Sequence, residues 1–341
     1  MTNLAVRDGH LRSSVALVLV AGLAGGILVA LMLGRYPLTI EEVVGSLSAA
    51  MNGGTFGEPV DSVVFGLRMP RILLAALAGA GLACAGAAFQ SLFGNPLATP
   101  DTLGVTSGAS IGAVVALLLN MSLIGMQLLA LVAGVVTVVL TTMISKTKQG
   151  TGIVMLILAG VMVGALANAV ISILKYTADP NDKLPQITYW LMGSLAGASF
   201  DSLLIGAPLI LGGIAIIYLL RWRLNVLALG EDESRAAGMN VRRIRAVIIG
   251  AATLITASVV SMCGQVGWIG LLIPHCARMI CGNNNRFIVP VGALLGAIFL
   301  VAIDTVARSV AASEIPISVV TSVLGAPFFI YLLRRTGGGW Q

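Results

Sequence analysis

Charged residues are scarce in this chain. Asp, Glu, Lys and Arg make up 10% of its 341 residues, whereas apolar residues make up 57%, and the mean hydropathy is +0.99. Soluble domains carry about 25% charged residues, so this composition excludes an ordinary water-soluble domain. We infer that lipid surrounds most of the protein.

Residues that carry out chemistry are equally few. The chain has two histidines, and neither has a second histidine near it to complete a metal site. The ATP-binding loop Gly-x-x-x-x-Gly-Lys-Ser/Thr and the hydrolase motifs His-Glu-x-x-His and Gly-x-Ser-x-Gly are absent from the sequence. We therefore expect no enzyme, with no catalytic residue, no metal site and no cofactor. Four cysteines without a repeated Cys-x-x-Cys pair are interpreted as small hydrophobic residues: Cys84, Cys263, Cys276 and Cys281.

The net charge of +6 would suggest nucleic acid binding in a soluble protein. In membrane proteins, basic residues instead accumulate in the cytoplasmic loops. We expect membrane lipid around the chain and no nucleic-acid partner.

Long apolar runs dominate the sequence. A helix needs about 20 apolar residues to cross a bilayer, and the 41 glycines suit close packing between such helices. The first run follows two arginines like a signal peptide, but its length and the many later runs favour an uncleaved helix. The pattern predicts an all-α, polytopic membrane helix bundle of about ten transmembrane helices. The predicted spans are 15–34, 71–92, 102–119, 123–143, 152–173, 201–219, 246–264, 267–281, 287–304 and 317–333.

Basic residues between the spans predict the orientation, because Lys and Arg near span ends stay in the cytoplasm. With both termini cytoplasmic, 14 of the 20 Lys and Arg residues fall on the cytoplasmic side. The six that fall outside are Arg35, Arg68, Arg71, Lys175, Lys183 and Arg308.

Two connections are too long to be simple turns. The outer connection, 35–61, predicts a short surface helix plus a loop. The charged inner connection, 221–245, divides one transmembrane domain, 1–341, into halves of about 1–200 and 201–341. A weak echo between the halves, Arg-Gln-Pro at 71, 90 and 96 and at 245, 265 and 274, fits an inverted repeat; chance similarity between glycine-rich helices explains it as well.

The inner connection has a candidate lever. Residues 234–239 are expected to form one or two helical turns between the helix stops Gly230 and Gly238. Such a helix, pushed by a cytoplasmic partner, would move the spans on both sides of it. An ordinary solvated charged loop is the other interpretation, and the spacing alone favours that loop.

The segment 94–100 contains two prolines and an asparagine between apolar runs. Non-helical backbone at membrane depth usually lines a cavity, so Asn95 and Leu97 are candidates for a narrow point at the cytoplasmic end of a pathway. A plain turn between two spans is an equally good interpretation.

Three outer arginines run against the charge rule. Arg68, Arg71 and Arg308 would suit an anionic ligand or an acidic partner, or serve as snorkelling anchors. Asp304 lies four residues before Arg308, which allows an ion pair on one helix face. The spans hold few other ionisable groups, which disfavours the alternative of an ion-coupled secondary transporter.

Several long motifs in order resemble one family, the FecCD-type permeases of ABC importers for iron chelates (siderophores), haem and vitamin B12. The motifs cover nearly the whole chain. They are RMPR (68–71), FGNPLATPDTLGVTSGASIGA (93–113), LAG (158–160), YWLMGSLAG (189–197), LGEDESRAAGMN (229–240), GWIGLLIPHCAR (267–278) and EIPISVVTSVLGAPFFIYLLRR (314–335).

The resemblance implies a type II ABC importer permease. Two copies of the chain would form a homodimer in the cell inner (plasma) membrane, with one pathway between them. Two separate ABC ATPase subunits would drive alternating access, and a periplasmic or lipid-anchored substrate-binding protein would deliver the cargo. Siderophore, haem, corrinoid and oxyanion importers share this scaffold, and the lack of a His or Cys ligand pair disfavours a bare metal ion as cargo.

The resemblance also implies roles for particular residues. Binding-protein docking falls on Arg68, Arg71 and Arg308, the inner gate on Asn95 and Leu97, and the pathway lining on Gly160, Gly164 and Asn168. The ATPase coupling segment comprises Leu229, Gly230, Glu231, Ser234, Arg235, Ala237 and Gly238.

Overall fold

The computed structural model describes residues 6–7, 10–146, 152–311 and 313–336, and in these ranges the chain folds as the predicted all-helical bundle. A two-stranded ladder of two-residue strands, β1 (Val6–Arg7) and β2 (His10–Leu11), precedes the helices. The helices are α1 (Ser13–Met32), α2 (Ile40–Met51), η1 (Ser62–Arg68), α3 (Met69–Phe93), η2 (Pro100–Leu103), α4 (Val105–Leu118), α5 (Leu123–Ile144), α6 (Ile153–Thr177), α7 (Lys183–Leu191), α8 (Phe200–Leu227), α9 (Glu231–Ala236), α10 (Val241–Cys263), α11 (Ile269–Cys281), α12 (Asn285–Ser309) and α13 (Ile317–Thr336).

Ten of these helices are apolar enough to account for the predicted spans. Seven are long enough to cross a membrane, and three shorter apolar helices accompany them: α4, α11 and residues 317–331 of α13. Each coincides with one of the ten predicted runs. The chain is therefore a multi-pass membrane protein, as predicted.

The structure departs from the predicted elements at several places, among them α7, α8 and α9. Helix α8 continues to Leu227 instead of ending at 219. Its last turns contain polar residues, which a prediction based on apolar runs leaves out. Helix α9 begins at Glu231, three residues before the predicted start, since Gly230 with φ 129° already ends the preceding turn. The nine-residue helix α7 was not predicted.

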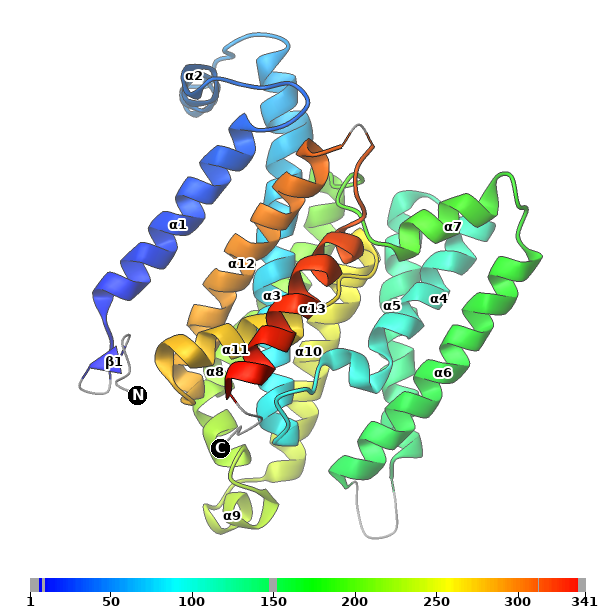
Figure 1. Cartoon of the computed structure of the whole chain (residues 1–341). Coiled ribbons are helices and arrows are strands. Elements are labelled where there is room, and N and C mark those ends of the chain that lie inside the picture. Colours follow the sequence, from blue (N-terminus) through cyan, green and yellow to red (C-terminus); the bar gives the residue numbers. More distant parts are fainter. Residues whose placement is uncertain (1–5, 8–9, 147–151, 312, 337–341) are drawn as a thin grey trace.

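The predicted surface helix in the outer connection is confirmed as α2. Thr39 and Glu42 form a reciprocal capping box at its first turn, with the Thr39 backbone N–H donating to the Glu42 carboxylate at 2.7 Å. Helix α2 lies at one end of the bundle and α9 at the opposite end (Figure 1). We call these the α2 end and the α9 end.

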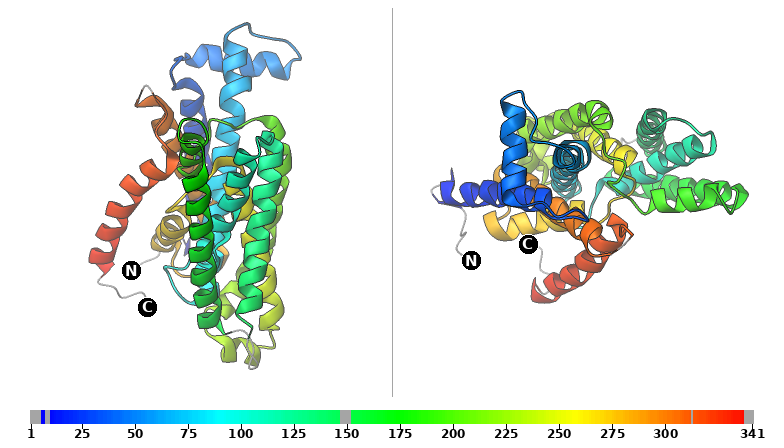
Figure 2. Two further views of the ribbon diagram at one scale, coloured as in Figure 1. Left: turned by 90° about the vertical axis from the view of Figure 1, so that its right-hand side faces the viewer. Right: turned by 90° about the horizontal axis from the view of Figure 1, so that it is seen from above.

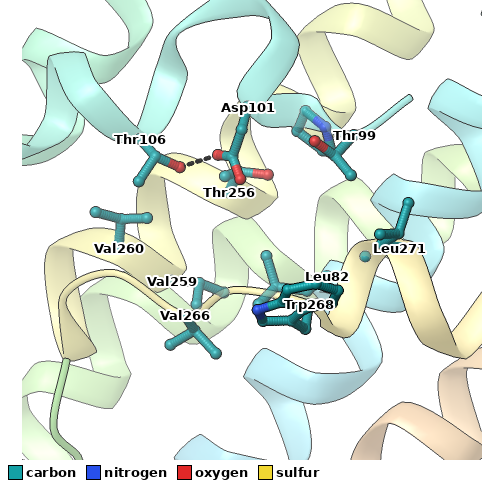
Figure 3. A pocket seen from close by; sticks show the side chains of 12 residues that line it. Leu82, Thr99, Asp101, Thr106, Thr256, Val259, Val260, Val266, Trp268 and Leu271 are labelled. Carbon is teal, nitrogen blue, oxygen red and sulfur yellow. Dashed lines mark hydrogen bonds between the residues drawn. The ribbon is translucent and has the colours of Figure 1, made fainter. Parts of the chain in front are cut away.

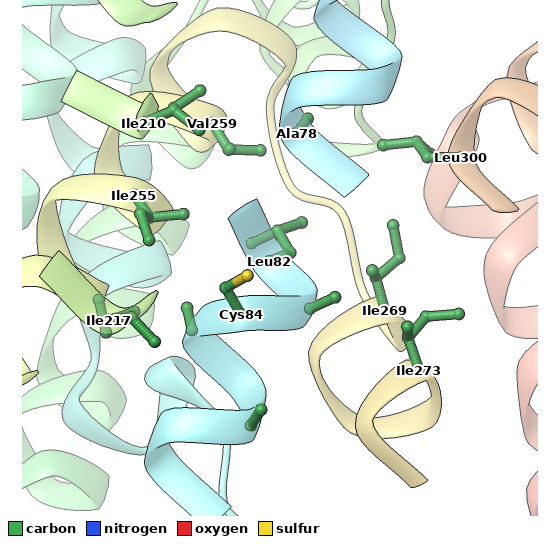
Figure 4. Close-up of a cluster of buried hydrophobic side chains, with 14 of the residues drawn as sticks. Ala78, Leu82, Cys84, Ile210, Ile217, Ile255, Val259, Ile269, Ile273 and Leu300 are labelled. Carbon is green, nitrogen blue, oxygen red and sulfur yellow. The ribbon is translucent and has the colours of Figure 1, made fainter. Parts of the chain in front are cut away.

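Helix α3 occupies the centre of the bundle and packs against α8, α10, α11 and α12. Small residues allow this close packing. A Cβ on Gly79 would lie 2.1 Å from the carbonyl oxygen of Gly296 on α12, and one on Gly86 would lie 1.9 Å from that of Gly270 on α11. Apolar side chains from the surrounding helices fill the remaining space around α3 (Figure 4).

Helices α1 and α6 lie at opposite edges of the bundle (Figure 2). Only 22% of the apolar window of α6 is buried, against 78% for α3 and for α10. Most of the α6 surface therefore faces away from its own chain.

Candidate coupling, gate and pathway sites

The connection between α8 and α10 forms a short helix that both neighbours hold. Gly230 and Gly238, with φ of 129° and 76°, stand on either side of α9, in a region of backbone conformation that favours glycine. The buried Ser234 hydroxyl donates to the carbonyl oxygens of Val226 at 2.9 Å and Gly230 at 2.5 Å. These bonds fix α9 to the end of α8.

Glu231 joins the same short helix to α10. Its carboxylate accepts from Arg235 at 2.5 Å within α9 and from Arg245 at 3.1 Å on α10. The Arg245 side chain is only 12% exposed, so the second pair is partly shielded from water.

Apart from Gly230, which precedes α9, the predicted coupling residues divide into two groups. Ser234 and Glu231 hold the segment in place, while the exposed members offer a surface to a partner: Leu229, Arg235, Ala237 and Gly238.

A polar cluster next to α9 was not predicted. Asn225, near the end of α8, donates to Asn284 at 2.8 Å and accepts from the backbone N–H of Asn285 at 2.7 Å. Asn285 in turn accepts from Ser91 near the end of α3 at 2.9 Å. The cluster ties α8, α12 and α3 together at the α9 end, and only their proximity in space reveals it.

The segment after α3 begins with a turn built on Asn95. Gly94 has φ 57°, the Asn95 side-chain oxygen accepts from the Leu97 backbone N–H at 2.9 Å, and the Ala98 N–H donates to the Asn95 carbonyl at 3.1 Å. Asn95 therefore shapes the turn, and the Leu97 side chain remains exposed. The gate role of both residues stays a prediction.

Beyond this turn, the chain returns towards the bundle as η2 and packs on α6. A Cβ on Gly160 would lie 1.9 Å from the carbonyl oxygen of Thr102, and one on Gly164 would lie 3.9 Å from Gly104. Asn168, farther along α6, is exposed. The structure thus brings two of the three predicted pathway residues against η2 and the start of α4, and their lining role stays a prediction.

At the α2 end, Arg71 forms a buried ion-pair network. Its guanidinium donates to Asp304 at 2.8 to 3.1 Å and to Glu314 at 2.7 Å. Arg308 lies 3.6 Å from the same Asp304, which confirms the ion pair predicted from their spacing.

Arg68 and Arg308 reach the end of α1, where the last carbonyls of a helix have no partner of their own. Arg68 donates to the carbonyls of Leu31, Met32 and Tyr36, and Arg308 donates to the carbonyl of Ala30. A cation at a helix C-terminus also interacts favourably with the helix dipole. The predicted docking arginines are therefore engaged within their own chain, and their docking role stays a prediction.

The sequence profile of the FecCD transport family matches residues 21–335. The chain belongs to this family. Among its relatives, this FecCD protein is 37% identical to the molybdate import system permease protein of Haemophilus influenzae, over 91% of this chain and 93% of that one. It is 40% identical to the cobalamin import system permease protein of Halobacterium salinarum, over 82% of this chain and 76% of that one.

A solved structure agrees with this membership. The FecCD protein superposes on an inward-facing conformation of a putative metal-chelate type ABC transporter with a TM-score of 0.86 and 35% identity, covering 95% of this chain and 99% of that one. The resemblance seen in the sequence motifs is thereby confirmed. None of these relatives is described as an ion-coupled carrier, so that alternative receives no support.

Proposed function

We propose that this chain is the membrane-spanning permease subunit of an ATP-driven importer that takes up a metal chelate or a corrinoid. The chain itself carries out no catalysis. Two copies enclose one pathway, two separate ATPase subunits bind the α9 end in the cytoplasm, and a substrate-binding protein docks at the opposite end.

The observation that carries this proposal is the way α9 is held. A six-residue helix with exposed Arg235 and Ala236 is fixed to α8 through Ser234 and to α10 through Glu231. Displacement of α9 by a partner therefore acts directly on two long helices. The neighbouring Asn225 cluster extends the connection to α3, next to the turn at Asn95.

The exposed face of α6 supports a second copy of the chain. Asn168 is exposed in the middle part of this 25-residue helix, and a polar side chain facing hydrocarbon is costly. Protein or water covering this face removes the cost. A pathway between two copies, lined by Asn168 and Gly164, places both protein and water against this face.

At the α2 end, a docking binding protein would compete with groups of this chain for the three arginines. Arg71 is occupied by Asp304 and Glu314, and Arg68 and Arg308 by the end of α1. Glu314 keeps a 30% exposed side chain, so it is the partner that an incoming carboxylate would displace most readily.

Reconstitution of the complete importer in vesicles tests the proposal. Glu231→Ala removes the link between α9 and α10, and we expect ATP hydrolysis to continue while cargo uptake falls at least fivefold. Asp232→Ala, at an exposed position of the same helix, is the matched control and should keep wild-type uptake. Full uptake by the Glu231 variant, or cargo accumulation by this chain in vesicles without nucleotide, would refute the mechanism.

A further inference from the structure

Two stretches of non-helical backbone meet inside the bundle. One follows α3 and leads through η2 to the 14-residue α4, and the other, residues 264–268, joins α10 to the 13-residue α11. Non-helical backbone at membrane depth is tolerated where it lines a cavity. In transporters, interrupted segments in the two halves of a chain commonly mark the binding site.

A cavity of about 30 Å³ lies between these two stretches. It is bordered by Leu82, near the middle of the 25-residue α3, and by Thr256 of α10. A rise of 1.5 Å per residue places Leu82 about 20 Å from the start of α3 and Thr256 about 22 Å from the start of α10. The cavity therefore lies about midway along α3.

One wall of the cavity carries a carboxylate. Asp101 in η2 accepts a hydrogen bond from the Thr106 hydroxyl in the first turn of α4 (Figure 3). Its other carboxylate oxygen takes no hydrogen bond from the described residues. Asp101 remains exposed, so the cavity is open on one side.

A buried threonine hydroxyl also lines the cavity. Thr256 is 2% exposed, and its Oγ1 has no hydrogen-bond partner within the part of the chain that the structure describes. A buried hydroxyl left unpaired costs free energy. The indole ring of Trp268 and the side chain of Leu82 provide apolar lining (Figure 3), and Thr99 and Thr106 are further polar residues of the lining.

A role for Asp101 confined to shaping η2 would need only the bond to Thr106. The unpaired oxygen, the unpaired Thr256 hydroxyl and the space between them, which has room for roughly two water molecules, call for a ligand. A carboxylate in such a place accepts hydrogen bonds from N–H and O–H groups. It also repels anions: at 8 Å and an effective dielectric constant of about 20, a singly charged anion is disfavoured roughly thirtyfold.

We propose that Asp101 and Thr256 form a subsite of the translocation pathway that binds a hydrogen-bond donor on the cargo and disfavours oxyanions. The cargo class that fits is a metal chelate or corrinoid with amide or hydroxyl groups on its periphery. This inference rests on the proposed importer function for its cargo, but the charge of the site can be measured without any cargo.

The first experiment measures that charge in the full-length chain. Thr99, which lines the cavity, is changed to cysteine in a variant whose four native cysteines are alanine. Its modification rates by a cationic and an anionic methanethiosulfonate are then compared. We expect the cationic reagent to react at least about thirtyfold faster, and Asp101→Asn to abolish the preference. Equal rates before the Asp101 change, or no reaction with either reagent, would overturn the subsite.

The second experiment measures uptake by the complete importer, with cyanocobalamin and molybdate as probes. Asp101→Asn and Thr256→Val should each raise the KM for cyanocobalamin at least fivefold. Thr305→Val, which removes a buried hydroxyl that donates to Val301 on α12 at 2.8 Å, is the control and should leave KM unchanged. Uptake of molybdate alone by the wild type, or an unchanged KM in both cavity variants, would overturn the subsite.

The two experiments separate the subsite from the function. If the wild type imports no cargo in the presence of ATP, the proposed function fails, and the thiol rates still decide whether Asp101 places a negative charge in an open cavity.

Discussion

The buried ion pair between Arg71 and Asp304 leads to a quantitative stability prediction. Asp304 is 1% exposed and accepts from the Arg71 guanidinium at 2.8 to 3.1 Å. Removing one member of a buried pair costs about 3–5 kcal/mol, because the remaining charge stays buried. In Asp304→Asn, Arg71 keeps Glu314 at 2.7 Å, so we expect a loss near the lower limit, about 3 kcal/mol.

This loss converts into a measurable shift. An unfolding entropy of about 2.1 cal/mol/K per residue gives roughly 0.7 kcal/mol/K for a chain of this length, so the midpoint of thermal unfolding should fall by about 4 °C. The assay is thermal unfolding of the purified protein in detergent.

Two further variants isolate the pair. Glu314→Gln changes a partner whose side chain is 30% exposed, and its cost should stay near 1 kcal/mol. Arg71→Gln combined with Asp304→Asn should cost less than the sum of the two single changes, because neither member of this pair is then left without the other. A wild-type midpoint for Asp304→Asn would refute this account of the network.

Two other predictions concern other parts of the chain. Gly86→Val should unfold at a markedly lower temperature than Gly26→Ala, because a Cβ at Gly86 would lie 1.9 Å from the Gly270 carbonyl whereas one at Gly26 meets nothing within 4 Å; equal midpoints would contradict the close packing of α3 on α11. Hydrogen bonds from Ser46 and from the backbone N–H of Gly57 hold the pKa of Asp61 below its ordinary value of 3.8. The stabilisation from Asp61 is therefore present above that value and is lost as the pH falls through the lower folded pKa. Hydrogen exchange at Gly57 should speed up relative to the intrinsic rate in that acidic range, and constant protection down to pH 2 would contradict it.

The sequence predicted those parts of the site that depend on neighbours along the chain. The pair of Asp304 and Arg308 follows from helix periodicity, and the two glycines around α9 follow from the backbone conformations that favour glycine. The start of α9 was placed three residues late, since the spacing of the charged residues there favours an ordinary loop over a helix.

Contacts between distant segments could not be predicted in the same way. Arg68 caps α1 across more than 30 positions of sequence, and the cluster of Asn225, Asn284 and Ser91 joins three helices. Polar residues at helix ends are common, and only the packing shows which of them meet.

The lipid that surrounds the chain accounts for what the sequence alone determined about this protein. A chain with 10% charged residues and ten apolar runs must place those runs in lipid as helices, because hydrocarbon offers no partners to backbone N–H and C=O groups. The tertiary structure decided where the exceptions to that rule lie. The pattern of apolar runs placed Asp101 in a loop between spans. In the structure the chain turns back at Asn95, η2 packs against α6 at Gly160, and Asp101 lines the same cavity as Thr256.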